Sequence, residues 1–142
     1  MTRTSKLAHA ADRTTRVVDL APGLRLAPVP GKGRGVFASR AFAKGEVVEV
    51  APVLVLPPEQ QDRLDGTVLD SYVFGWRDTV ALCLGCGSLY NHAWDACLEY
   101  QRHLDECLID FVAIRDIAAG EELTINYTSS NPGRPDLWAD LA

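Results

Sequence analysis

The chain has 142 residues, of which 47% are hydrophobic, and its formal net charge at pH 7 is −5. A chain of this length can bury the core of one domain without disulfides or metal ions. The acidic balance argues against direct nucleic-acid binding, which uses a basic surface to displace counterions from phosphate, and it favours a basic partner. The longest apolar stretch, residues 47–56, is interrupted by Glu49 and Pro52 and is too short to cross a membrane.

The first residues predict a flexible arm and no secretory signal. Residues 1–21 are polar and mixed, and the charged start is followed by His9, Asp12 and Arg13 instead of an apolar segment. We therefore expect an intracellular protein, cytoplasmic or nuclear. Its folded domain is expected over residues 22–128.

From residue 24 onward, short apolar or β-branched runs alternate with turn signals, which predicts a mainly β fold (β-rich α+β) with little helix. A short helix can follow Pro57 and Pro58, because proline is tolerated in a first helical turn. Residues 89–92 are expected to form a loop or a single helical turn. The expected strands cover residues 24–29, 35–38, 47–50, 53–56, 70–76, 79–84, 98–104, 108–114 and 123–127.

Three motifs follow one another along the chain: Gly-Lys-Gly-Arg-Gly-Val-Phe-Ala at residues 31–38, Asn-His at 91–92, and Gly-Glu-Glu-Leu-Thr-Ile-Asn-Tyr at 120–127. In this order they resemble the motifs of SET-domain protein-lysine methyltransferases. The resemblance covers about residues 22–127. It implies the SET-domain fold of several short strands and small sheets, S-adenosylmethionine as cofactor, and a lysine of a protein substrate, such as a histone or histone-like tail, as methyl acceptor.

The first two motifs supply candidate cofactor-binding residues. Glycines let a backbone approach a ligand closely, and in the SET family the matching glycines lie against the cofactor. Asn91 can offer a donor and an acceptor to the amino-acid end of the cofactor, and the backbone around His92 can face its adenine. The alternatives are a hairpin turn at the glycines and a purely structural His92. With the closing tyrosine, the candidate set is Lys32, Gly33, Arg34, Gly35, Asn91, His92 and Tyr127.

Tyr127 is the main catalytic candidate, since it matches the tyrosine that closes the family's third motif. A fixed phenolic oxygen can hold methyl donor and amine in line. Tyr72 is the second candidate, by resemblance to short viral SET proteins.

The acceptor amine must be neutral, and an aromatic channel desolvates the ammonium and lowers its pKa. Tyr72, Phe74 and Trp76 alternate, so we expect them on one face of a strand, as a channel wall or as a core stripe. The candidate channel residues are Tyr72, Phe74, Trp76, Tyr90 and Trp138.

The central motif departs from the family pattern. Ala93, Ala96 and Cys97 stand where the family usually has serine, proline and asparagine. These changes favour an alternative reading, in which the chain is a weak or inactive SET module that binds a peptide or partner without turnover. They are expected to affect the rigidity of this loop and the reaction rate more than they affect cofactor binding.

The cysteines are read as buried reduced thiols. Only Cys83 and Cys86 form a Cys-x-x-Cys pair, while Cys97 and Cys107 are far apart, so we expect no metal site. A zinc-structured adaptor is a distant alternative. Glu121 and Glu122 are read as turn and surface carboxylates. They do not form a glycosidase pair, because adjacent strand residues point to opposite faces and cannot flank one bond.

The cysteine-rich segment that closes the lysine channel in many SET enzymes has no counterpart after Tyr127. In this the chain is similar to the short viral SET proteins, which are homodimers that act on histone tails. The resemblance therefore implies that a homodimer can form. Residues 129–142, with Trp138 as anchor, are expected to fold back as a cover for the channel.

Overall fold

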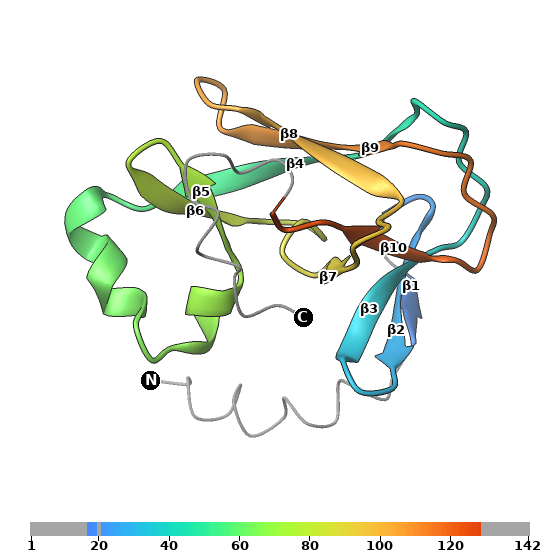
Figure 1. The fold of residues 1–142 in the computed structure, drawn as a ribbon, viewed down its shortest axis with the longest axis horizontal. Helices are drawn as coiled ribbons and strands as arrows, with labels where there is room; N and C mark the ends of the chain where they lie inside the picture. The colour runs from blue at the N-terminus through green and yellow to red at the C-terminus, as the bar shows by residue number, and fades with distance from the viewer. Residues whose placement is uncertain (1–16, 20, 129–142) are drawn as a thin grey trace.

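A computed structural model describes residues 17–19 and 21–128. Most of the predicted arm and all of residues 129–142, including Trp138, lie outside the described residues. The described part is mostly strand with little helix, which confirms the predicted fold class (Figure 1). Its elements are β1 (Val18–Asp19), β2 (Leu24–Val29), β3 (Gly33–Ala38), β4 (Val47–Val55), the 3-10 helices η2 (Pro58–Leu64) and η3 (Val68–Ser71), β5 (Val73–Trp76), β6 (Thr79–Cys83), β7 (Asn91–His92), β8 (Leu98–His103), β9 (Leu108–Ala113) and β10 (Glu122–Ile125).

The strands are hydrogen-bonded in the order β1-β2-β3-β10-β8-β9-β4-β6-β5, and β7 pairs with β10 beside this path. In Figure 1 the hairpin β2–β3 and the later strands meet at β10. Strand β10 is antiparallel to β3 and parallel to β7 and β8. The closing motif is therefore inserted between the first and the central motif.

Strand β7 corrects the expected loop or helical turn at residues 89–92. Asn91 pairs with Thr124 and His92 with Ile125, in parallel register. A two-residue strand has no period that a sequence pattern can reveal, and its partner is more than thirty residues away. The pairing places the Asn-His motif directly beside the closing strand.

Strand β4 runs unbroken through Pro52, where the sequence predicted two separate strands. Up to Pro52 the strand pairs with β9, and from Val53 it pairs with β6. Proline cannot donate to a ladder, but its carbonyl accepts the N–H of Leu84 at 2.9 Å. Pro52 is therefore tolerated where the strand changes partner.

The expected strand over residues 70–76 is shorter in the structure. Asp70 and Ser71 belong to η3, Tyr72 ends that helix, and the strand begins only at Val73. All four residues of β5 are buried, whereas Tyr72 is 40% exposed. Tyr72 therefore does not share a strand face with Phe74 and Trp76. Residue propensities alone did not show the helical turn that ends at Tyr72.

The core is a continuous apolar cluster with an aromatic centre. Phe74 meets Tyr100 edge-on at 5.2 Å between ring centroids, and Tyr90 packs against Phe111 at 4.7 Å. Tyr90 and Phe111 are completely buried. Such ring pairs stabilise a fold beyond the area that they bury. They also fix the aromatic side chains from which the site is built.

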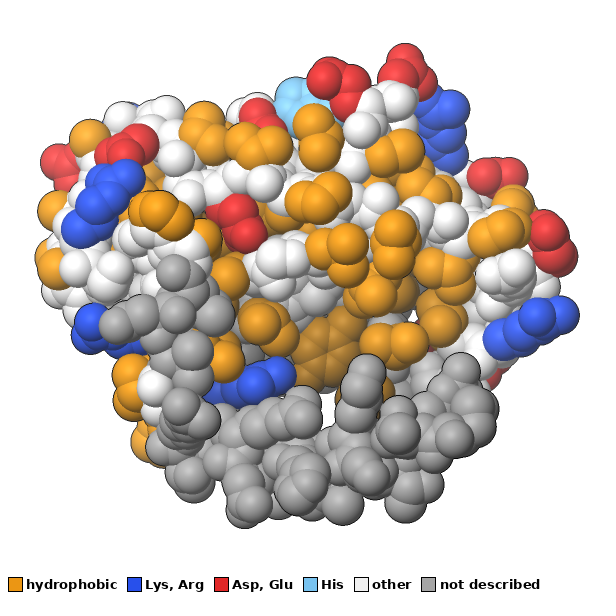
Figure 2. Space-filling view, turned by 180° about the vertical axis from the view of Figure 1, so that it is seen from behind, with side chains coloured by type: hydrophobic (Ala, Val, Ile, Leu, Met, Phe, Trp, Pro, Cys, Tyr) orange, Lys and Arg blue, Asp and Glu red, His pale blue; other side chains and the backbone are white. Residues whose placement is uncertain are grey.

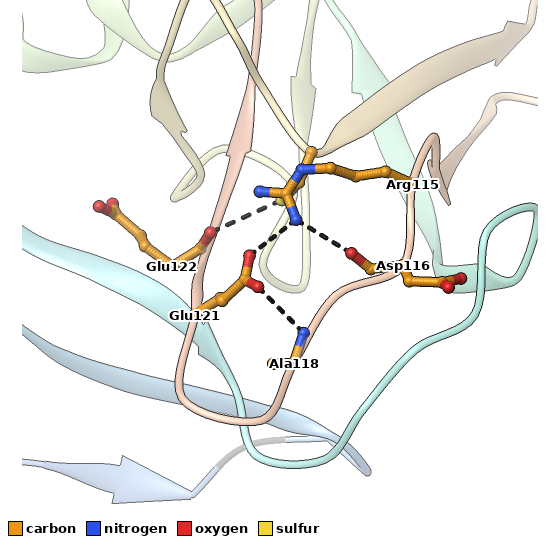
Figure 3. A network of polar contacts seen from close by, with 6 residues as sticks. Arg115, Asp116, Ala118, Glu121 and Glu122 are labelled. Carbon is orange, nitrogen blue, oxygen red and sulfur yellow. Dashed lines mark hydrogen bonds and ion pairs between the residues drawn. The ribbon is translucent and has the colours of Figure 1, made fainter.

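The turn between β9 and β10 is held by charged groups (Figure 3). Glu121 accepts the N–H of Ala118 at 3.2 Å and an Arg115 guanidinium N–H at 2.9 Å. These two contacts, in that order, lower the pKa of Glu121. Figure 3 shows the Glu122 side chain directed away from this network. Glu121 is a turn carboxylate, and Glu122 has a different role.

Hydrophobic side chains gather over the middle of the face opposite to that in Figure 1, with most charged side chains toward its margins (Figure 2). None of the helices in the described part has the length and apolar character needed to cross a membrane.

Candidate functional site

A narrow aromatic pocket lies where the central and closing motifs meet. Its free volume is about 10 Å³, room for about one water-sized group. Five elements or their flanking residues supply its aromatic side chains: η3, β5, β7, β8 and β10. The lining residues are Ser71, Tyr72, Val73, Phe74, Gly87, Ser88, Tyr90, Tyr100 and Tyr127.

The structure brings together three of the candidate channel residues, Tyr72, Phe74 and Tyr90, with the candidate catalytic Tyr127. Trp76 does not join them. It is 2% exposed and lines a separate groove beside η2. Trp76 follows Phe74 by two residues on β5, so these two share a strand face, but only Phe74 lies at the pocket.

Tyr100 was missed by the sequence reading. It alternates with Leu98 along β8 and therefore looks like an ordinary core position. Its hydroxyl donates a hydrogen bond to the carbonyl of Tyr127 at 3.1 Å. Since a buried tyrosine hydroxyl usually finds a partner, this contact helps to fix the closing segment.

Tyr127 is held at three points. Its hydroxyl donates to the carbonyl of Tyr90 at 2.6 Å, and its backbone N–H donates to His92 Nδ1 at 3.1 Å. Its carbonyl accepts the hydroxyl of Tyr100. Burial, and then the nearby Tyr72, Glu122 and Tyr100, raises the pKa of Tyr127 to about 12. The phenol is therefore protonated at neutral pH, and its oxygen keeps lone pairs for other contacts.

Asn91 lies between the first and closing motifs. Its Nδ2 donates to the carbonyl of Arg34 at 3.0 Å and to Glu122 Oε2 at 2.7 Å. Both partners are acceptors, which fixes the orientation of the amide. Its Oδ1 is then the group that can accept from a ligand. Glu122, predicted to lie at the surface, is partly buried and belongs to this site.

Gly35 is required by this close approach. A Cβ at residue 35 would lie 2.5 Å from Glu122 Oε2 and 2.8 Å from Asn91 Nδ2. Such contacts are shorter than any that real Cβ atoms make, so a larger residue must displace both polar groups. The absent side chain lets Asn91 and Glu122 lie directly against the backbone of residue 35.

His92 joins the cofactor candidates to Tyr127. Because its Nδ1 accepts the Tyr127 N–H, the neutral ring carries its proton on Nε2. Burial, and then the charge of Lys32, lowers the pKa of His92. Nε2 is buried and has no hydrogen-bond partner among the described residues. Lys32 reaches the His92 carbonyl with its Nζ at 3.4 Å, so the first and central motifs meet here.

The unusual central motif remains tied to the closing strand. The N–H of Ala93 donates to Ile125 at 3.0 Å, and Cys97 Sγ lies 3.6 Å from the carbonyl of Glu122. Ala96 and Cys97 are buried in the core. Small apolar residues thus fill positions where polar ones would need partners.

All four cysteines are free thiols, and the described residues contain no group of three His, Cys, Asp or Glu side chains that could hold a metal ion. Burial raises the pKa of both Cys83 and Cys86 to about 12, with a further contribution from the charge of Glu49. These thiols are protonated at neutral pH, and the thiolate is the form that binds metals.

The chain matches the SET domain family model over residues 33–128. A relative from Schizosaccharomyces pombe, named histone-lysine N-methyltransferase, H3 lysine-37 specific, is 33% identical over 98 residues, which make up 68% of this chain and 67% of that protein. The crystal structure of a Plasmodium falciparum candidate histone methyltransferase has a similar fold, with a TM-score of 0.62 at 22% identity over 76% of this chain and 95% of that one. A chain of the Chaetomium thermophilum polycomb repressive complex 2, solved with S-adenosylmethionine, has a TM-score of 0.58 at 26% identity over 73% of this chain and 14% of that one.

Proposed function

The chain belongs to the SET-domain family, and from this premise we propose that it is a protein-lysine N-methyltransferase that uses S-adenosylmethionine. The position of Tyr127 is the main support for the roles that we assign to the site residues. Tyr127 lines the aromatic pocket with its side chain while its backbone N–H is held by His92, in the segment proposed to bind the cofactor. A single residue thus borders both places that a methyl transfer must join.

The residues opposite the pocket fit S-adenosylmethionine. Asn91 Oδ1 is an oriented acceptor for the ammonium of an amino acid, and Gly35 lets Asn91 and Glu122 lie directly against the backbone of β3. Glu122 adds a carboxylate to the same place. When bound there, the cofactor supplies an electrophilic methyl group on a positively charged sulfur. We propose Lys32, Gly33, Arg34, Gly35, Asn91 and His92 as its binding residues.

The aromatic lining of the pocket suits a lysine side chain, and its walls must move apart to admit one, because the free volume is about 10 Å³. An unperturbed lysine has a pKa of about 10.4, and desolvation among aromatic rings favours its neutral, nucleophilic form. The narrow space excludes bulk water around an inserted side chain. Tyr72, Phe74 and Tyr90 form the wall, and the lone pairs of the Tyr127 oxygen orient the amine or the methyl group. Positioning is the main contribution of the protein to such an in-line transfer.

Calorimetric titration with S-adenosylmethionine followed by methyl transfer to a mixture of histones tests this proposal. A ligand that binds only the folded state, at about 100 times its dissociation constant, adds about 2.7 kcal/mol to the stability. We therefore expect a clear rise in melting temperature. No binding at millimolar cofactor contradicts the proposal, whereas binding without transfer supports the alternative of an inactive peptide-binding module.

The proposal also includes a class of substrate and a cellular location. We propose a lysine-rich tail, such as that of a histone, as substrate, because the net charge of −5 favours a basic partner. Four free thiols suit a reducing compartment, which supports a nuclear or cytoplasmic location.

We also propose a homodimer. Exposed apolar side chains along β4, Val50 at 53% and Leu54 at 57%, offer a surface for a second copy. Light scattering coupled to size-exclusion chromatography gives the mass of the particle in solution. A mass of 15.5 kDa at all concentrations contradicts the dimer.

A further inference from the structure

Glu49 is a partly buried carboxylate next to the proposed lysine channel, and none of the family motifs includes it. It lies on β4, opposite Phe111 of β9, at a register shift between Val47 and Glu49. A β-bulge re-aims the side chains of its strand. Here Glu49 faces the side of the sheet on which the fully buried Phe111 lies.

Both oxygens of this carboxylate accept hydrogen bonds from the segment that leads to the channel. Oε1 accepts the Tyr90 hydroxyl at 2.6 Å, and Oε2 accepts the backbone N–H of Cys86 at 2.9 Å. Hydrogen bonds to a charged acceptor are shorter and stronger than neutral ones. The carboxylate thus holds both ends of residues 86–90.

The chain is shaped to admit the carboxylate. Gly85 has φ +63°, and a Cβ at this position would lie 2.5 Å from Glu49 Oε2. A substituted residue would meet both the unfavourable φ and the collision. Because residue 85 has no side chain, the Glu49 carboxylate can occupy the space beside Cys86.

The same segment determines the position of Tyr127. The carbonyl of Tyr90 accepts the Tyr127 hydroxyl at 2.6 Å, and the Tyr90 ring lines the channel. Tyr90 therefore connects Glu49, through its side chain, to Tyr127, through its backbone. Burial and then the charge of Glu49 raise the pKa of Tyr90 well above its usual value, so its hydroxyl keeps the proton that it donates.

We propose that Glu49 is a positioning residue for methyl transfer, which sets the geometry of Tyr90 and, through it, of the Tyr127 hydroxyl. This inference rests on the proposed function. Glu49 does not line the pocket itself and so acts through these two tyrosines. A displacement of about 1 Å in an aligned group can reduce a rate by about 100-fold, which gives this distant carboxylate its importance.

The test compares Glu49→Gln, Glu49→Ala and Tyr90→Phe with the matched control Glu46→Gln. Glu46 lies just before β4 and bonds Arg40 and the Ala43 N–H, away from the pocket. A glutamine at residue 49 can satisfy only one of the two donors, because its amide has one acceptor oxygen. We expect kcat to fall at least tenfold in Glu49→Gln and further in Glu49→Ala, with the Kd for S-adenosylmethionine within twofold of wild type.

A double-mutant cycle separates positioning from general destabilisation. If Glu49 acts through the Tyr90 hydroxyl, Tyr90→Phe should cost much less activity in the Glu49→Ala background than in wild type. Provided that the wild type is active, two outcomes overturn the inference. One is an unchanged kcat in Glu49→Gln, and the other is full additivity of the two mutational effects in the cycle.

Amide hydrogen exchange of residues 86–90 provides a readout that does not depend on activity. We expect faster exchange in Glu49→Gln than in Glu46→Gln, measured by mass spectrometry on folded protein. Unchanged exchange overturns the anchoring by Glu49. If the wild type transfers no methyl group, the proposed function fails, and the exchange result still decides whether Glu49 holds this segment.

Discussion

At the scale of single residues, Tyr127 depends on contacts that come from distant parts of the chain. Tyr90, His92 and Tyr100 each fix one of its polar groups. A tyrosine whose hydroxyl, backbone N–H and carbonyl are each hydrogen-bonded loses little conformational freedom when a substrate binds, so it is pre-organised for the proposed transfer.

Removing the Tyr127 hydroxyl tests this role. We expect Tyr127→Phe to lower kcat by about 10- to 100-fold, since one hydrogen-bonded group is worth about 1–3 kcal/mol. The ring stays packed, so the Kd for S-adenosylmethionine should stay near that of wild type in calorimetry. An unchanged kcat would move the role to Tyr72.

Glu121 and Glu122 are neighbours in sequence with different roles, and they form a matched pair of variants. Glu122→Gln removes the charge that orients Asn91, so we expect the Kd for S-adenosylmethionine to rise about tenfold. Glu121→Gln loses an exposed ion pair with Arg115, which is worth about 1 kcal/mol or less, and should not change the Kd. Equal effects of both variants on cofactor titrations would remove Glu122 from the site.

At the scale of elements, β3 and β10 form the backbone of the proposed cofactor site. Register between the two strands pairs Glu122 with Phe37 and Leu123 with Val36. Because β7 joins the other edge of β10, the first and central motifs come within hydrogen-bond distance of each other. The site therefore depends on strand pairing across the whole length of the domain.

Gly35→Ala tests how closely these strands approach. The added methyl group collides with Glu122, Asn91 and Val29. We expect a loss of about 1–3 kcal/mol in folding stability, typical of overpacking, and a loss of cofactor binding. Gly66→Ala serves as control, since its φ of +79° adds strain but nothing lies within 4 Å of its Cβ, and it is not among the proposed cofactor-binding residues. Cofactor binding that falls equally in both variants would contradict the steric explanation.

At the scale of the whole molecule, buried acids make the fold sensitive to alkaline pH. The pKa values of Cys83 and Cys86 are raised from 9.0 to about 12, and that of Tyr127 from 10.0 to about 12. Below pH 9 both the folded and the unfolded chain keep these protons. Above it the unfolded chain loses them first, so the free energy of unfolding falls with rising pH.

We therefore expect the urea midpoint to be similar at pH 7 and pH 8.5 and to fall progressively between about pH 9 and pH 12. Circular dichroism during urea titrations at several pH values measures this change. Cys83→Ala and Cys86→Ala should each weaken the pH dependence above pH 9. A midpoint that does not change up to pH 11 would show that these groups are not buried as protonated acids.

The sequence by itself determined the fold class and the family, because short β-branched runs, turn residues and three ordered motifs are local features. It also predicted Tyr127, Asn91 and His92 as site residues, because their types are tied to those motifs. The alternation of aromatic residues along the sequence did not determine which aromatic side chains meet at the pocket. Tyr72 and Tyr100 line the pocket and Trp76 does not, because the end of η3 and the pairing of β8 set their directions.

Only the tertiary structure decided which groups the carboxylates contact. Glu49 and Glu122 look like ordinary strand residues, and each gains its role from a donor more than thirty residues away, Tyr90 and Asn91 respectively. Strand β7 likewise exists only because β10 lies beside it. Contacts of this kind arise from long-range pairing and from the bulge in β4, which no local pattern of residues encodes.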